Sequence, residues 1–168
     1  FLVMLVSIYL LNHSLIKYFS LIKPGVLGYS SEITAQKVFN QTNQQRVDLG
    51  LNPLKYNPVL SKSATKKAQD MFANNYWAHT SPNGTTPWDF FKSAGYQYSL
   101  AGENLARDFY DTESLLKAWM DSPTHKANII NSKYQEIGIG VVNGILNGMK
   151  TTLVVQHFGT PIGSLSSS

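Results

Sequence analysis

The sequence contains no cysteine among its 168 residues. This absence excludes disulfide bonds, thiolate metal sites and catalysis by a cysteine nucleophile. It does not exclude an extracellular location, because a domain of roughly 130 residues buries enough surface to fold without covalent cross-links. The hydrophobic content of 43% is sufficient for one packed core. The length therefore predicts a single domain with an additional terminal segment.

Charged residues are also few, at 14% of the chain, and the formal net charge is +4. Two of the basic residues, Lys17 and Lys23, fall in the N-terminal segment considered next. The other lysines are scattered, and no basic stripe alternates with aromatic residues. Nucleic-acid binding depends on such a basic surface. We therefore expect no nucleic-acid partner.

A long apolar run occupies the N-terminus. Residues 1–16 contain no charged side chain, and residues 1–11 (FLVMLVSIYLL) are almost wholly apolar. Such a run is typical of a signal-peptide core of about 7–15 residues. Residues 1–21 also approach the roughly 20 residues that a membrane helix needs. We expect residues 1–31 to be a signal peptide or membrane anchor followed by a linker; a buried N-terminal helix is the alternative.

The next hundred residues show helical periodicity with recognisable ends. Asn57-Pro58 and Thr86-Pro87 each combine a capping residue with proline at the first helical position, and Gly95 is a typical stop signal. The expected helices span residues 33–49, 58–72, 86–92, 112–121 and 123–130.

The last third of the body changes to the alternation of a strand. In residues 137–142 (IGIGVV), isoleucine or valine alternates with two glycines and a valine, and residues 151–158 supply the return strand of a hairpin. Asn143-Gly144 and Asn147-Gly148 are both turn signals. We expect an α/β (α+β) domain over residues 32–161, with helices around a small, mainly antiparallel sheet, followed by a polar tail over residues 162–168.

Two histidines lie where they could carry chemistry. His79 follows the second expected helix, in a loop that ends at Pro82-Asn83-Gly84. His125 lies in the first turn of the helix that Ser122-Pro123 opens, where the helix dipole disfavours a second positive charge. A neutral imidazole can ligate a metal or accept a proton. The alternative for both is a structural loop or cap histidine.

The remaining candidates are carboxylates and one further histidine. Glu103 lies between a glycine and a small polar residue with apolar neighbours, which is unusual for a solvated charge; a buried carboxylate bonded to backbone amides is the alternative. Glu136 precedes a strand and could be an ordinary edge charge. His157 is expected to be a packed or edge histidine, and no role is expected for His13.

Motif searches alone assign no activity. The chain has no HExxH, no GxSxG and no glycine-rich phosphate loop. His79, Glu103 and His125 are separated by 24 and 22 residues, which defines no metal site by spacing.

Four ordered motifs carry a resemblance to a known family. They are residues 76–82 (YWAHTSP), 101–105 (AGENL), 119–129 (WMDSPTHKANI) and 136–140 (EIGIG). Together they resemble bacterial, SCP-like extracellular members of the CAP superfamily, which includes cysteine-rich secretory proteins, antigen 5 and pathogenesis-related 1 proteins. The resemblance covers residues 33–161.

The resemblance implies an α-β-α sandwich, secretion, and a cleft lined by two histidines and two acidic residues. His79, Glu103 and His125 match three of these positions. The second acid of the family corresponds here to Ser122, so we name Asp121 and Glu136 as its candidate replacements.

The resemblance further implies an extracellular or cell-surface binding module, whose ligand belongs to the envelope, the host or the lipids. His79, Glu103 and His125 form a reasonable set for Zn²⁺ or another divalent cation, with water in an open position. We expect a monomer, attached to a membrane through the N-terminal segment if that segment is retained.

Two other function classes stay open. In a peptidase-like hydrolase, His79 or His125 would be the base, Glu103 would orient it, and Ser81 or a metal-bound water would attack. In a purely structural adhesin or spacer, the polar cluster would only fix the loops.

Overall fold

The computed structural model describes residues 29–30 and 32–163. The prediction of a signal peptide or anchor falls almost wholly on residues outside this range, as does most of the predicted tail. No helix in the described part of the chain is long and apolar enough to span a membrane. The helices are α2 (Ala35–Asp48), α3 (Pro58–Ala73), α4 (Pro87–Ala94), α5 (Thr112–Asp121) and α6 (Pro123–Ile129).

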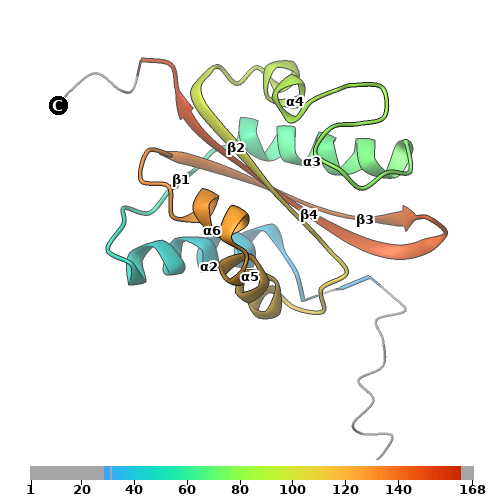
Figure 1. Cartoon of the computed structure of the whole chain (residues 1–168), viewed down its shortest axis with the longest axis horizontal. Coiled ribbons are helices and arrows are strands. Elements are labelled where there is room, and N and C mark those ends of the chain that lie inside the picture. The colour runs from blue at the N-terminus through green and yellow to red at the C-terminus, as the bar shows by residue number, and fades with distance from the viewer. Residues whose placement is uncertain (1–28, 31, 164–168) are drawn as a thin grey trace, which may run out of the picture.

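Four strands form one mixed sheet between two helical layers. They are β1 (Lys55–Tyr56), β2 (Tyr98–Arg107), β3 (Glu136–Leu146) and β4 (Met149–Pro161). Their order is β1-β3-β4-β2, with antiparallel β3-β4 and β2-β4 pairs and a parallel β1-β3 pair. Figure 1 shows α3 and α4 on one side of the sheet and α2, α5 and α6 on the other. The predicted α-β-α sandwich is confirmed.

The helix ends follow the capping residues of the sequence. The Asn57 side chain accepts hydrogen bonds from the backbone N–H groups of Val59 and Leu60 at the start of α3. Thr86 and Asp89 form a capping box at the start of α4, and Gly95 ends that helix with φ +92°. These local signals are why the helix predictions agree with the structure within a few residues.

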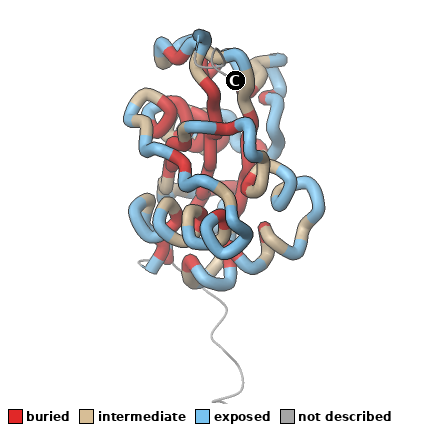
Figure 2. Tube along the Cα trace, turned by 90° about the vertical axis from the view of Figure 1, so that its left-hand side faces the viewer, coloured by how far each residue is buried: buried red, intermediate tan, exposed pale blue. Residues whose placement is uncertain are grey.

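The glycines of β3 allow α3 to lie directly on the sheet. A Cβ atom at Gly138 would overlap the backbone of Leu60 and Ser61, and one at Gly140 would lie 2.6 Å from the carbonyl carbon of Ala64. Ser61 Oγ accepts a hydrogen bond of 3.0 Å from the backbone N–H of Ile139. This close approach places α3 over β3 and β4. Figure 2 shows the buried residues along these inner strands.

The hairpin differs from the prediction in two respects. Asn143-Gly144 lies inside β3 rather than in a turn. The absence of a side chain at Gly144 leaves space for the Phe72 ring, which a Cβ atom there would approach to 2.7 Å. The turn is at Asn147-Gly148, where both residues have positive φ. The return strand also extends beyond residue 158, to Pro161. Strands β1 and β2 are not predicted from the sequence, and β2 carries the candidate site.

Candidate functional site

A buried carboxylate on β2 bridges two imidazoles. Glu103 pairs across the sheet with His157 of β4, so both side chains lie on the face covered by α3. Glu103 Oε1 is 2.6 Å from His79 Nδ1, and Oε2 is 2.9 Å from His157 Nε2. The Glu103 side chain is 2% exposed. Both carboxylate oxygens are therefore committed to imidazole nitrogens.

The electrostatics favour an ionised Glu103 beside a neutral His157. Burial alone would raise the pKa of Glu103, but hydrogen bonds from His157 and His79 outweigh it and lower that pKa. Burial lowers the pKa of His157, against the opposing influence of Glu103. A neutral His157 then donates from Nε2 to Glu103 and accepts at Nδ1 from Ser63 Oγ, which is 2.9 Å away. The Phe91 ring stacks on His157 at 4.3 Å between centroids.

His79 is the exposed end of this chain of hydrogen bonds. Its side chain is 57% exposed, whereas His157 and Ser63 are fully buried. Because Nδ1 faces Glu103, Nε2 is the ring nitrogen left for a ligand. A buried carboxylate that holds one imidazole nitrogen fixes both the tautomer and the orientation of the ring.

A buried lysine fixes the loop that carries His79. Lys67 of α3 is fully buried, and its ammonium donates to the carbonyls of Ala78 and His79 at 2.9 and 2.7 Å. It also donates to Tyr76 Oη at 2.9 Å, and that hydroxyl donates to Asp70 at 2.6 Å. Burial lowers the pKa of Lys67, while the charges of Glu103 and Asp70 act in the opposite direction.

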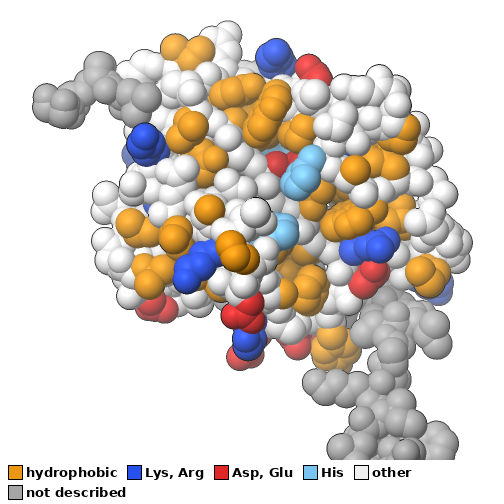
Figure 3. Space-filling view, viewed as in Figure 1, with side chains coloured by type: hydrophobic (Ala, Val, Ile, Leu, Met, Phe, Trp, Pro, Cys, Tyr) orange, Lys and Arg blue, Asp and Glu red, His pale blue; other side chains and the backbone are white. Residues whose placement is uncertain are grey.

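His125 approaches from the other helical layer. Its Nδ1 is 2.7 Å from Ser122 Oγ, and its ring lies nearly parallel to that of Trp119 at 25°. Burial lowers the pKa of His125, and the proximity of His79 lowers it further. The two histidines are therefore close enough to interact electrostatically. Figure 3 shows histidine side chains near the middle of this face, with an acidic side chain beside them.

Strand β2 brings the two histidines together because it is the edge of the sheet. Glu103 points to the α3 layer, and its neighbour Asn104 points to the α6 layer. Asn104 Nδ2 donates to the His125 carbonyl at 3.1 Å and to Gln156 Oε1 at 3.1 Å. The two helical layers thus meet across one short segment of strand, and each contributes one imidazole.

The outer side of β2 is covered by side chains from the second layer. Since β2 is the last strand of the sheet, its outward carbonyls have no neighbouring strand as a partner. Side chains donate to three alternate carbonyls instead, each at 3.1 Å: Tyr134 Oη to Ala101, Asn128 Nδ2 to Glu103, and Trp119 Nε1 to Leu105. The backbone around Glu103 is consequently fixed on its outer edge as well as in the sheet.

The two acidic candidates are engaged elsewhere. Asp121 is exposed and pairs with Lys117 at 2.5 Å. Glu136 accepts hydrogen bonds from Asn57 Nδ2 at 3.0 Å and Tyr96 Oη at 2.7 Å. The assignment of either residue to the cleft stays a prediction. Ser122 occupies the position that matches the second acid of the family, and its hydroxyl contacts His125 Nδ1.

The described residues include no group of three or more histidine, cysteine, aspartate or glutamate side chains arranged to hold a metal ion. The three-residue set predicted from the sequence therefore needs a different division of roles. Both Glu103 side-chain oxygens contact imidazole nitrogens, whereas the contacts of His79 and His125 are through Nδ1 and leave Nε2 for a ligand. Imidazole nitrogen is a donor type that Zn²⁺ accepts, and a metal-binding histidine commonly has a carboxylate on its other nitrogen, as His79 has in Glu103.

Sequence reasoning missed Lys67, and it left His157 without a role in the site. A signal for Lys67 exists, because it lies three residues after Ala64 and four before Met71, on the apolar face of α3. The expectation of a packed histidine at His157 is confirmed by its full burial, but its contact with Glu103 requires β2, which was not predicted.

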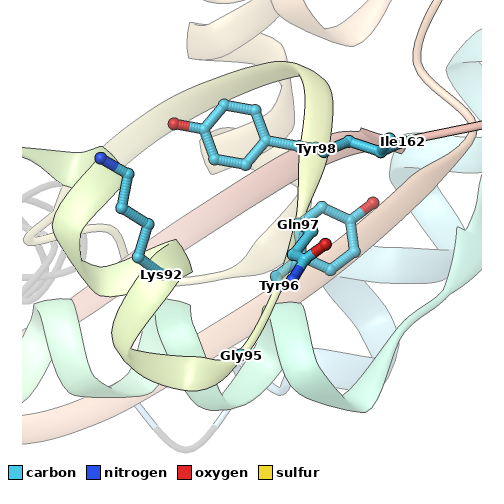
Figure 4. Close-up of a pocket in the computed structure, with 6 residues that line it drawn as sticks. All are labelled: Lys92, Gly95, Tyr96, Gln97, Tyr98 and Ile162. Carbon is cyan, nitrogen blue, oxygen red and sulfur yellow. The ribbon is translucent and has the colours of Figure 1, made fainter.

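A second groove lies at the beginning of β2. Figure 4 shows Lys92 of α4 and the Tyr98 ring above the Gly95 turn. The groove has a volume of about 460 Å³ and is lined by Lys92, Gly95, Tyr96, Gln97, Tyr98 and Ile162. His79, His157 and Asn128, which form hydrogen bonds with Glu103, do not line it.

Comparison with protein families and curated proteins gives consistent matches. Residues 39–158 match the sequence model of the cysteine-rich secretory protein family (CAP). The protein YkwD of Bacillus subtilis is 45% identical over 107 residues, which are 64% of this chain and 42% of YkwD. This chain therefore corresponds to less than half the length of YkwD.

Solved structures show the same fold. An extracellular protein containing an SCP domain from Bacillus anthracis matches with a TM-score of 0.65 and 28% identity, over 74% of this chain and 39% of that one. An outer surface protein of Borrelia burgdorferi matches with a TM-score of 0.64 and 25% identity, over 79% of this chain and 99% of that one.

Proposed function

This chain belongs to the cysteine-rich secretory protein (CAP) family, and we propose that it is an extracellular or cell-surface binding module whose ligand enters between His79 and His125. The location is supported by the similar extracellular and outer surface proteins of Bacillus anthracis and Borrelia burgdorferi. The observation that carries the binding role is the buried Glu103 carboxylate, which holds His79 in one tautomer and leaves Nε2 outward.

A divalent cation is the first ligand to consider. Zn²⁺ accepts neutral imidazole nitrogen, and histidine ligands commonly donate their second nitrogen to a carboxylate. His79 and His125 would hold the cation through Nε2, and Glu103 would orient His79 rather than bind the metal. Such a cation would supply an electrophilic centre with open positions for an oxygen atom of a second ligand.

The hydrolase alternative gains no support from the serine residues. Ser63, His157 and Glu103 form a serine-histidine-acid chain, but Ser63 and His157 are fully buried, so a substrate cannot reach the hydroxyl. Ser81 is buried as well, and its hydroxyl is bonded to Asn83 and to the backbone N–H of Thr85. A metal-bound water is the remaining nucleophile of that hypothesis.

Zinc titration of the purified chain tests the proposal. We expect Zn²⁺ to bind and to raise the melting temperature, and His79→Ala or His125→Ala to abolish both effects. Glu103→Gln should weaken binding by about 10–100-fold, as expected for a carboxylate that orients a ligand. Asp48→Asn, at the exposed end of α2, serves as the control and should bind like the wild type.

Two results would contradict the proposal. Absence of any thermal shift at millimolar Zn²⁺ would remove the cation from it. Degradation of a peptide or peptidoglycan library by the wild type, lost in Glu103→Gln, would favour the hydrolase over the binding module.

A further inference from the structure

Exposed apolar side chains gather at the end of the β3-β4 hairpin. The described part of the chain has nine large hydrophobic side chains that are exposed, and four of them lie here. They are Tyr29, Tyr110, Ile145 and Met149, with exposed fractions of 43, 64, 51 and 63%. We call this set the hairpin-end surface. The other five are distributed over the rest of the fold.

The hairpin and the first described residues form this surface together. Ile145 pairs across the hairpin with Lys150, whose ammonium lies 5.9 Å from the centroid of the Tyr29 ring. The backbone N–H of Ser30 donates to Thr152 Oγ1 at 3.0 Å, and Ser30 Oγ donates to the Tyr110 carbonyl. The chain therefore enters the domain at this end and is fastened to it (Figure 1).

The chemistry of the surface fits the boundary between lipid and water. Tyrosine is enriched at that boundary, and lysine can bury its methylene stem while its ammonium stays in the polar layer. The two acidic neighbours of Tyr110 are engaged: Asp108 lies 3.4 Å from Arg107, and Asp111 accepts the helix-capping bond from Ser114 at 2.7 Å. Lys150 lies among the aliphatic and aromatic side chains of this surface, and Arg107 and Asp108 form a partly exposed ion pair at its border.

The sequence that precedes Tyr29 indicates which partner the hairpin-end surface has. Residues 1–16 carry no charge, and eight residue steps separate Leu21 from Tyr29. Eight steps extend at most about 29 Å. If the apolar run lies in a bilayer, the point where the chain joins the domain can lie no more than about 29 Å from the lipid surface. We propose that the hairpin-end surface rests on an anionic or zwitterionic lipid surface and orients the domain there.

The test uses the full 168-residue chain in vesicles of phosphatidylcholine and phosphatidylglycerol. Because the chain has no cysteine, Ile145→Cys, Met149→Cys and Ser132→Cys each place a single fluorophore. Ser132 is the matched control: it is exposed and precedes β3, whose 11 residues separate it from the turn by about 33 Å.

Lipids with a nitroxide near the headgroup should quench the labels at positions 145 and 149 several-fold more than the label at 132. Aqueous iodide should quench them in the reverse order. Equal quenching at the three positions would overturn the proposal, and so would a chain that does not sediment with the vesicles. Protection of positions 145 and 149 from iodide without vesicles would assign the surface to a second copy of the chain instead. Zinc binding by the labelled proteins is measured in parallel, because it tests the histidine cleft independently of the contact with lipid.

Discussion

Replacing Lys67 by methionine removes the ammonium that holds the His79 loop while keeping an unbranched side chain in the core. The variant leaves three acceptors without their donor: the carbonyls of Ala78 and His79 and the hydroxyl of Tyr76. A buried polar group that loses its partner costs about 1–3 kcal/mol. The loss is offset in part because methionine needs no desolvation of a charge. We expect a net destabilisation of about 2–4 kcal/mol.

Urea denaturation measures this change, and imidazole nitrogen chemical shifts report on His79. Lys66→Met is the matched control, because Lys66 makes one exposed hydrogen bond, of 3.2 Å, to the Ser93 carbonyl. It should change the stability by less than about 0.5 kcal/mol. If Lys67→Met is as stable as Lys66→Met and leaves the His79 shifts unchanged, the loop is not held by the ammonium and the reasoning fails.

Two further predictions concern the buried cluster and the helix-sheet contact. The lowered pKa of His157 means that the unfolded chain binds a proton more readily, so stability should fall as the pH drops below about 6.5. The lowered pKa of Glu103 acts in the same direction at lower pH, since its contribution is lost as pH falls through the folded pKa. His157→Gln should flatten the pH dependence between about 7 and 5, measured by urea denaturation with EDTA present; an unchanged slope would contradict the assignment. Gly138→Ala should destabilise by about 3 kcal/mol or more, because its methyl group meets the α3 backbone; a melting temperature within a degree or two of the wild type would refute it.

The sequence predicts the helices well and the site only in part, for reasons that particular residues make clear. Asn57 and Gly95 are strong local signals, and the helix ends follow them. Strand β2 lacks the usual alternation, because it buries polar residues on both faces: Glu103 meets His157 on one, and Asn104 meets Gln156 on the other. Hydrophobic periodicity cannot identify a strand whose buried side chains are satisfied by hydrogen bonds across layers.

The roles within the cluster depend on contacts between distant segments. The motifs predict that Glu103 belongs with His79, but a cross-strand pair with His157 requires the β2-β4 register. The same limit applies to Glu136, whose partners Asn57 and Tyr96 come from segments 79 and 40 residues away. Sequence spacing carries no information about such pairs when the strand itself is not recognised.

The covered outer edge of β2 also determines whether a strand of another chain can pair with this sheet. An uncovered edge strand can pair with an extended segment of another molecule, which is a common start of aggregation. Here the hydroxyl of Tyr134, the amide of Asn128 and the indole of Trp119 occupy the outward carbonyls that a visiting strand would need. The side chains that support the histidine cleft thereby also prevent strand addition at this edge. Replacing these side chains is expected to weaken the cleft and to expose the edge at the same time.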